Sequence, residues 1–161
     1  MPHNKTSSTT LRIEPLDPLK LPLITRLYKA HYPSAKAKSH ELTLVAYQDN
    51  HLCGVVRLRP IDRFRLVTGM LVVPEFRGQG IAHHLMEHCQ QHLFKTDDYC
   101  FAYEHLVPFY AQHSFTALDP ATLPEPLHSL FQRYSRSGKA LVAMHWKNAN
   151  PQANSSPNLE S

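Results

Sequence analysis

The sequence predicts a single α/β domain with a mixed sheet of six or seven strands flanked by helices. Strand and helix patterns alternate along the chain, and residues 65–73 (RLVTGMLVV) are apolar on both faces towards their end. A strand of that kind is typical of the centre of a sheet that helices cover on both sides. In residues 80–93, apolar side chains recur with a period of 3.6, which predicts an amphipathic helix beside that strand.

The remaining elements follow from local patterns. Asp17 before Pro18 predicts an N-cap followed by a first helical residue, and Pro33 ends the helix that they begin. The turn Gln48-Asp49-Asn50 joins two strands as a hairpin. The predicted order is strand 11–15, helix 18–32, strand 41–47, strand 51–59, strand 65–73, helix 80–93, strand 98–103, helix 107–112, strand 115–118, helix 125–134 and strand 140–146.

The composition indicates a folded core between two polar ends. Hydrophobic residues make up 42% of the 161 residues and charged residues 19%, which suffices for a core. Residues 1–10 and 148–161 are polar and predicted to be disordered tails, so the domain spans 11–147. Neither a signal peptide nor a membrane span is evident, and we expect a cytoplasmic protein. Three cysteines without a CxxC pair exclude a disulfide scaffold and a four-cysteine zinc site.

The net charge of +4 favours an anionic partner, such as nucleic acid or a phosphorylated cofactor. Basic and aromatic residues do not interleave and no helix-turn-helix pattern is present, so a nucleic-acid-binding domain is the weaker interpretation. Four arginines, Arg57, Arg59, Arg63 and Arg65, are predicted to lie on a solvated face or a hairpin edge. The alternative is a functional role, in which these arginines bind a 3′-phosphate or an acidic acceptor.

Residues 71–82 carry the clearest chemistry in the chain. Gly78 and Gly80 form its only close glycine pair, placed between a buried strand and the start of a helix. A helix N-terminus presents unpaired N–H groups and a partial positive charge, and Arg77 adds a cation there. The pattern predicts a cradle for a phosphate or pyrophosphate, with a plain turn as the alternative. It matches neither a P-loop nor the G-x-G-x-x-G fingerprint.

The stretch Arg77-Gly78-Gln79-Gly80-Ile81-Ala82 resembles the acyl-CoA-binding motif [QR]-x-x-G-x-[GA] of the GNAT (Gcn5-related N-acetyltransferase) family. Val72 and Pro74 match the phrase that precedes it. Residues 109–115 (FYAQHSF) resemble the family's F-Y-x-x-x-G-F segment, with Ser114 in place of the glycine. The order of elements also matches over 11–146. The helix 125–134 is a departure, because many members have a shorter connection there.

The resemblance implies an N-acetyltransferase that uses acetyl-CoA as cosubstrate and no metal. The strand before the motif would splay from the next parallel strand and admit the acyl-CoA. The expected cofactor-binding residues are Leu71, Val72 and Val73, with backbone groups of Leu71 and Val73 on the pantetheine arm, and Arg77, Gly78, Gln79, Gly80, Ile81 and Ala82, whose segment binds the pyrophosphate.

An amine of a small molecule or peptide would attack the thioester directly in the implied reaction. The alternative is an acyl-CoA sensor or partner subunit that has lost turnover. Whether the chain forms a homodimer is left open.

The expected acid and base come from two further segments. In the resembled family a tyrosine of the F-Y segment often protonates the departing thiolate, which maps onto Tyr110; a phenol pKa near 10 suits that task. Residues 63–73 contain no carboxylate or histidine, so the strand glutamate that some family members carry has no counterpart here. Glu104 is the nearest candidate base. Tyr110 as a core residue, and Glu104 as a helix cap with water as the base, are the alternatives.

For the histidines of the helix 80–93 and for two cysteines, a structural role is favoured over a functional one. His84, His88 and His92 follow helical spacing, which predicts a polar or half-packed face more strongly than a metal site. Cys53 and Cys100 lie on predicted strands among apolar neighbours, so packing is their expected role.

Overall fold

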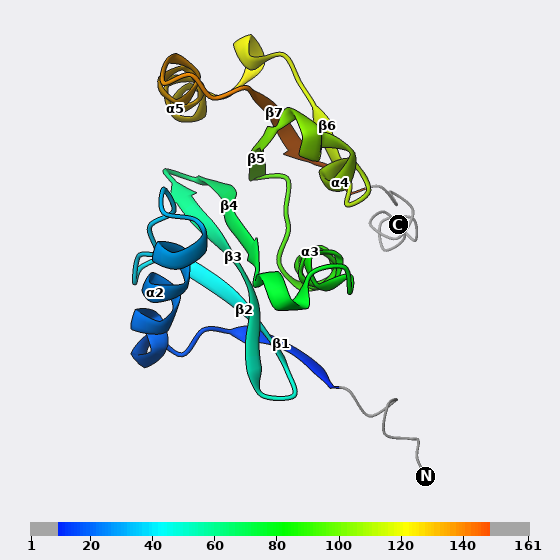
Figure 1. Cartoon of the computed structure of the whole chain (residues 1–161). Coiled ribbons are helices and arrows are strands. Elements are labelled where there is room, and N and C mark those ends of the chain that lie inside the picture. Colours follow the sequence, from blue (N-terminus) through cyan, green and yellow to red (C-terminus); the bar gives the residue numbers. More distant parts are fainter. Residues whose placement is uncertain (1–9, 149–161) are drawn as a thin grey trace, which may run out of the picture. The chain divides into compact units, whose positions relative to one another are not determined.

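The computed structural model describes residues 10–148, and the predicted tails lie outside this range except for Thr10 and Asn148. Seven strands form one sheet in the order β1-β2-β3-β4-β5-β7-β6 (Figure 1). The predicted fold class and order of elements are confirmed, with most ends shifted by one or two residues. The elements are β1 Leu11–Pro15, η1 Pro18–Lys20, α2 Leu21–His31, β2 Leu42–Gln48, β3 His51–Ile61, β4 Phe64–Val72, η2 Pro74–Phe76, α3 Ile81–His92, β5 Asp98–Tyr103, η3 Glu104–Leu106, α4 Val107–Ala111, β6 Phe115–Ala117, η4 Pro120–Thr122, α5 Glu125–Arg136 and β7 Leu141–Trp146.

Within residues 10–148 the chain forms two compact units, residues 10–59 with 67–92 and residues 60–66 with 93–148. In the first unit, the antiparallel strands β1, β2 and β3 carry helices on opposite faces. Val45 and Val55 pack with Ile24 of α2 in one buried cluster. Gly54, the neighbour of Val55, faces Leu85 of α3, because successive strand residues point to opposite faces.

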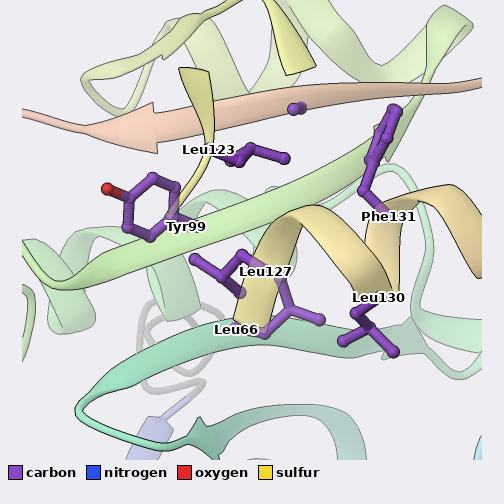
Figure 2. Close-up of a cluster of buried hydrophobic side chains, with 7 residues drawn as sticks. Leu66, Tyr99, Leu123, Leu127, Leu130 and Phe131 are labelled. Atoms are coloured by element: carbon purple, nitrogen blue, oxygen red, sulfur yellow. The ribbon is translucent and has the colours of Figure 1, made fainter. Parts of the chain in front are cut away.

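In the second unit, β5 and β6 both pair with β7 in antiparallel fashion. Helix α5 buries Leu127, Leu130 and Phe131 against Tyr99 and Ala143 of these strands (Figure 2). The other face of the strands carries an aromatic cluster in which ring centroids lie 5.4–5.8 Å apart; it consists of Phe94, Tyr110, Phe115 and Trp146. The helix that departs from the resembled family thus supplies one side of this unit's core.

Two of the four arginines contradict the expectation of a solvated face. Arg57 is only 5% exposed and forms an ion pair with buried Glu41 at 2.6 Å. Arg65 forms two 2.8 Å hydrogen bonds with the carboxylate of Asp98, which is fully buried. Both partners are distant in sequence, so local charge patterning could not reveal them. The positive charge at both positions is thus paired with a buried carboxylate.

Among residues 10–148, no helix combines the length and the apolar character that a membrane span requires.

Ser114 has a left-handed backbone, with φ of 72°, at the position where the resembled segment has glycine. A non-glycine residue in that conformation costs about 1–2 kcal/mol. Glycine removes this strain but loses more chain entropy on folding, by roughly 0.5–1 kcal/mol. We expect Ser114→Gly to stabilise the protein by about 0.5–1 kcal/mol, measured as a rise in the thermal unfolding midpoint.

Ser129→Gly in the interior of α5 is the matched control. There the same substitution places glycine inside a helix and removes the hydrogen bond from the Ser129 hydroxyl to Glu125, so the midpoint should fall. A lower midpoint for Ser114→Gly as well would contradict the strain at Ser114.

Candidate functional site

The strand that precedes the predicted cradle is held firmly at its end. The Val73 N–H donates to the Cys53 carbonyl of β3 at 2.8 Å. The Val73 carbonyl accepts a hydrogen bond from the Phe76 N–H at 2.8 Å, within the turn formed by η2. The N–H group of Val73 is therefore engaged inside the protein, and its carbonyl already has one partner.

The hydrogen bond from Val73 to Cys53 determines which backbone groups of β4 face each edge of the strand. In a sheet, the N–H and C=O groups of successive residues point alternately to the two edges of the strand. Leu71 therefore points with Val73 toward β3, whereas Met70 and Val72 point to the other edge. The Val72 carbonyl accepts a hydrogen bond there from Arg77 Nε at 3.0 Å. Met70 could not be singled out from the sequence, because a register shift of one residue leaves no mark in the motif.

The glycine turn has the geometry expected of a cradle. Gly78 and Gly80 have φ angles of 82° and 78°, which L-residues rarely adopt. A Cβ at Gly78 would meet no atom within 4 Å, and one at Gly80 would meet only the ring of His84, at 3.9–4.0 Å. The backbone on this side is therefore accessible to a ligand.

Helix α3 begins directly after the second glycine. The His84 N–H donates to the Gly80 carbonyl at 3.0 Å, which is the first bond of the helical pattern. The N–H groups of Ile81 and Ala82 precede that bond and have no partner within the helix by its geometry. Together with the helix dipole and Arg77, they form a local environment that favours an anion.

Gln79, between the two glycines, is tied to another part of the first unit. Its side chain shares a 3.0 Å hydrogen bond with Gln48 at the end of β2. Arg77 uses Nε on the Val72 carbonyl, and a guanidinium has four further N–H donors with which it can bind a phosphate. The turn is thus fixed through side chains on both sides of Gly78.

Glu104 and Tyr110, the expected base and acid, both lie in the second unit, while the cradle lies in the first. Glu104 is exposed in the 3-10 turn η3, and no side chain caps the start of α4. The expected alternative, in which Glu104 caps that helix, has no support in this geometry. Tyr110 is buried on α4, where its ring stands edge-on to Phe109 at 5.0 Å and to Phe115 at 5.8 Å.

Burial governs the remaining titratable candidates. Cys53 and Cys100 are fully buried, which confirms their packing role, and desolvation raises the pKa of both thiols. The rings of His88 and His92 lie 4.8 Å apart on α3. Desolvation, and to a smaller extent the charge of the neighbouring His92, lowers the pKa of His88, so its ring is mostly neutral at pH 7. Within residues 10–148, no group of three or more metal-ligating side chains is assembled.

The family model described as "Acetyltransferase (GNAT) domain" matches residues 24–125, which is more than half of the chain. The chain belongs to the GNAT acetyltransferase family. This GNAT chain also resembles solved structures, and the three given next share 14–16% identity with it, which establishes the fold alone. Among curated protein sequences, none matches it significantly.

Three of these structures illustrate the likeness. N-acetylglutamate synthase from Neisseria gonorrhoeae, complexed with coenzyme A and N-acetyl-glutamate, has a TM-score of 0.68 and 14% identity over 85% of this chain and 35% of the synthase. Rv2747 from Mycobacterium tuberculosis, in complex with CoA and NLQ, has a TM-score of 0.66 and 16% identity over 84% of this chain and 98% of its own. PaiA N-acetyltransferase from Thermoplasma acidophilum, in complex with coenzyme A, has a TM-score of 0.57 and 14% identity over 86% and 99%. The GNAT chain thus spans about a third of the synthase and nearly all of the other two.

The cradle can be tested with two substitutions that differ only in charge. Asn and Asp both tolerate left-handed backbone, and they have the same size. We expect Gly80→Asp to weaken CoA binding at least 10-fold more than Gly80→Asn, because only Asp places a negative charge beside the pyrophosphate. Calorimetric titration with CoA measures the difference. Equal affinities in the two variants would mean that no anion binds at this turn.

Proposed function

We propose that this protein transfers an acetyl group from acetyl-CoA to the amine of a small molecule or peptide. The observation that carries the proposal is the cradle: two left-handed glycines open helix α3 beside Arg77, in a member of the GNAT family. An anion bound there has backbone donors, a helix dipole and a guanidinium within one turn of chain. The pyrophosphate of acetyl-CoA is the ligand that this arrangement suits.

The backbone geometry of β4 refines which groups would hold the pantetheine arm. Val73 uses its N–H on Cys53, so the sequence-based assignment to Leu71 and Val73 shifts by one residue. In the refined proposal, Met70 and Val72 present N–H and C=O groups to the amides of pantetheine. Arg77 Nε already occupies one lone pair of the Val72 carbonyl, and a carbonyl oxygen can accept a second hydrogen bond.

The reaction itself needs two proton transfers. The amine attacks the thioester carbonyl, the C–S bond breaks, and the products are an acetylated amine and CoA. One proton leaves the ammonium form of the acceptor, and one reaches the departing thiolate. Glu104 takes the first and Tyr110 supplies the second in this proposal, and neither step requires a metal ion.

For the acceptor, small amines are the first class to test. The N-acetylglutamate synthase structures are complexed with N-acetyl-glutamate, an acetylated amino acid, and with L-arginine, an amino acid. For the location, a cytoplasmic protein is proposed, since Cys53 and Cys100 are buried among apolar side chains and suit a reducing compartment.

The alternative function is an acyl-CoA-binding module without turnover. One observation favours it: β4 and the residue before it, 63–72, carry neither a carboxylate nor a histidine. Titration with acetyl-CoA, followed by a panel of amino acids, polyamines and peptides with thiol release as the signal, separates the two functions. Binding with turnover supports the enzyme, binding without turnover on any acceptor supports the sensor, and no binding rejects both.

Tyr110→Phe tests the proposed acid. We expect kcat to fall roughly 100-fold or more with CoA affinity unchanged, because the thiolate loses its proton donor while the ring keeps its packing. Steady-state kinetics beside a CoA titration provide both values. Tyr99→Phe removes a hydroxyl from another buried tyrosine of the same unit and should leave kcat unchanged. An unaltered kcat in Tyr110→Phe would reduce Tyr110 to a core residue.

Glu104→Gln tests the proposed base through the pH dependence of kcat/KM. In the parent protein, protonation of Glu104 at low pH removes the base, so kcat/KM should fall as pH decreases. The glutamine variant has no carboxylate to titrate, and this acidic limb should disappear along with most of the activity. Glu125→Gln, which changes another exposed glutamate of the same unit, should keep the limb. Its persistence in Glu104→Gln would transfer the role of base to another group or to water.

A further inference from the structure

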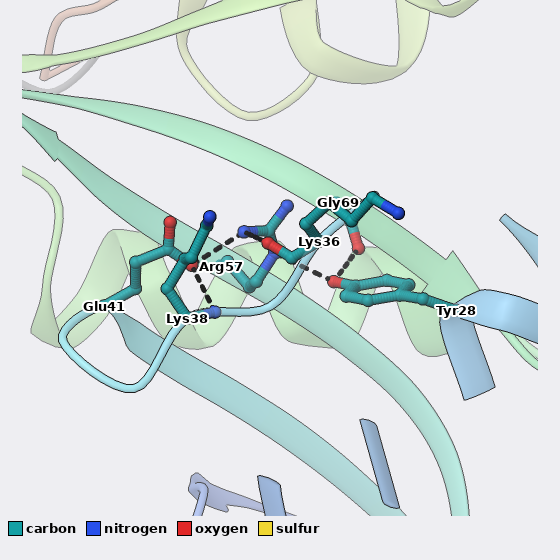
Figure 3. A network of polar contacts seen from close by, with 6 residues as sticks. All are labelled: Tyr28, Lys36, Lys38, Glu41, Arg57 and Gly69. Carbon is teal, nitrogen blue, oxygen red and sulfur yellow. Dashed lines mark hydrogen bonds and ion pairs between the residues drawn. The ribbon is translucent and has the colours of Figure 1, made fainter. Parts of the chain in front are cut away.

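A buried chain of hydrogen bonds leads from β3 through helix α2 to the backbone of β4 (Figure 3). Arg57 Nε donates to the Tyr28 hydroxyl oxygen at 3.2 Å, and the Tyr28 hydroxyl donates to the Gly69 carbonyl at 2.7 Å. Burial raises the pKa of Tyr28 to about 12, although the charge of Arg57 opposes this shift. The hydroxyl therefore keeps its proton at physiological pH, and the direction of both hydrogen bonds is fixed.

The guanidinium of Arg57 is held from its other side as well. Nη1 donates to Glu41 Oε1 at 2.6 Å and to the Lys36 carbonyl at 2.7 Å. Glu41 Oε1 also accepts from the Lys38 N–H at 3.3 Å. A planar guanidinium with partners at Nη1 and at Nε has little freedom to rotate. Arg57 thus presents Nε to Tyr28 in one orientation.

Gly69 is the point of β4 at which this chain of bonds ends. Its φ is 68°, in the middle of a strand. An added Cβ would overlap the Tyr28 hydroxyl and would approach Arg57 Nε to 2.8 Å. A left-handed residue inside a strand turns its carbonyl out of the ladder and changes the register of the residues that follow. The carbonyl of Gly69 accepts the hydrogen bond from the Tyr28 hydroxyl.

The register beyond Gly69 decides which backbone groups face away from β3. The bond from Val73 N–H to Cys53 fixes the far end of this segment, and Gly69 fixes its beginning. Met70 and Val72 lie between the two. Without the left-handed residue, the alternation of backbone groups along β4 would place Leu71 and Val73, rather than Met70 and Val72, at the edge that faces away from β3.

We propose that Tyr28 and Arg57 are positioning residues, which hold Gly69 in its left-handed conformation so that Met70 and Val72 present their backbone groups to the pantetheine arm of acetyl-CoA. The inference rests on the proposed function for the identity of the ligand. Two separate parts of the protein then bind the two halves of the ligand. The cradle at Gly78 and Gly80 binds the pyrophosphate without help from Gly69, and Met70 and Val72 bind the pantetheine arm.

Two ligands distinguish a positioning role from a merely structural one. Adenosine 3′-phosphate 5′-diphosphate contains the part of CoA that the cradle would bind, and acetyl-CoA adds the pantetheine arm. We expect Tyr28→Phe to weaken acetyl-CoA binding and raise its KM roughly 5- to 10-fold, the scale of one lost hydrogen bond. Its affinity for adenosine 3′-phosphate 5′-diphosphate should stay within about twofold of the parent's.

Two further variants complete the experiment. Arg57→Lys keeps a cation opposite Glu41 but lacks Nε, so it should show the same selective loss as Tyr28→Phe. Tyr47→Phe is the control, because Tyr47 belongs to the same buried cluster as Tyr28 and is not part of this hydrogen-bond chain; both affinities should remain unchanged.

Unchanged acetyl-CoA binding in the two test variants would overturn the inference, as would an equal loss of both ligands. A parent protein that binds neither ligand would overturn the proposed function together with it.

Discussion

The left-handed backbone at Gly69 is the constraint on which the proposed pantetheine-binding segment of β4 depends. It lies in the middle of β4, and four residues later the Val73 N–H donates to the Cys53 carbonyl of β3. Met70 and Val72 lie within this short segment, and the Val72 carbonyl accepts the hydrogen bond from Arg77. A bulge of this kind is costly unless its surroundings hold it in place. Here a tyrosine and an arginine do so.

Much of the fold could be read from the sequence because its signals are local. The N-cap at Asp17, confirmed by its hydrogen bond to the Leu19 N–H, and the apolar period of α3 depend on residues a few positions apart. The cradle was readable for the same reason. Gly78, Gly80 and the start of the helix at Ile81 lie within four residues, and no distant partner is needed to interpret them.

The parts that could not be predicted depend on partners far along the chain. Arg57 is 29 residues from Tyr28 and 16 from Glu41, so its charge reads as solvated until the fold brings these groups together. Gly69 reads as an ordinary glycine in a strand, and its effect on register is a tertiary one. As a result, the sequence motif assigns the pantetheine contacts to Leu71 and Val73, whereas the register after Gly69 leads to the proposal of Met70 and Val72.

The buried ion pair of Arg57 and Glu41 makes hydrogen bonds that apolar side chains at the same positions could not make. Desolvation of Arg57 and Glu41 offsets most of their mutual attraction, so such a pair contributes little net stability compared with packed apolar groups. Two leucines could fill the same volume. They could not donate to the Tyr28 oxygen, and they would leave the Lys36 carbonyl without the hydrogen bond it accepts from Arg57. The pair is therefore better explained by orientation than by stability: it selects one conformation of the β4 backbone among several that a purely apolar core would tolerate.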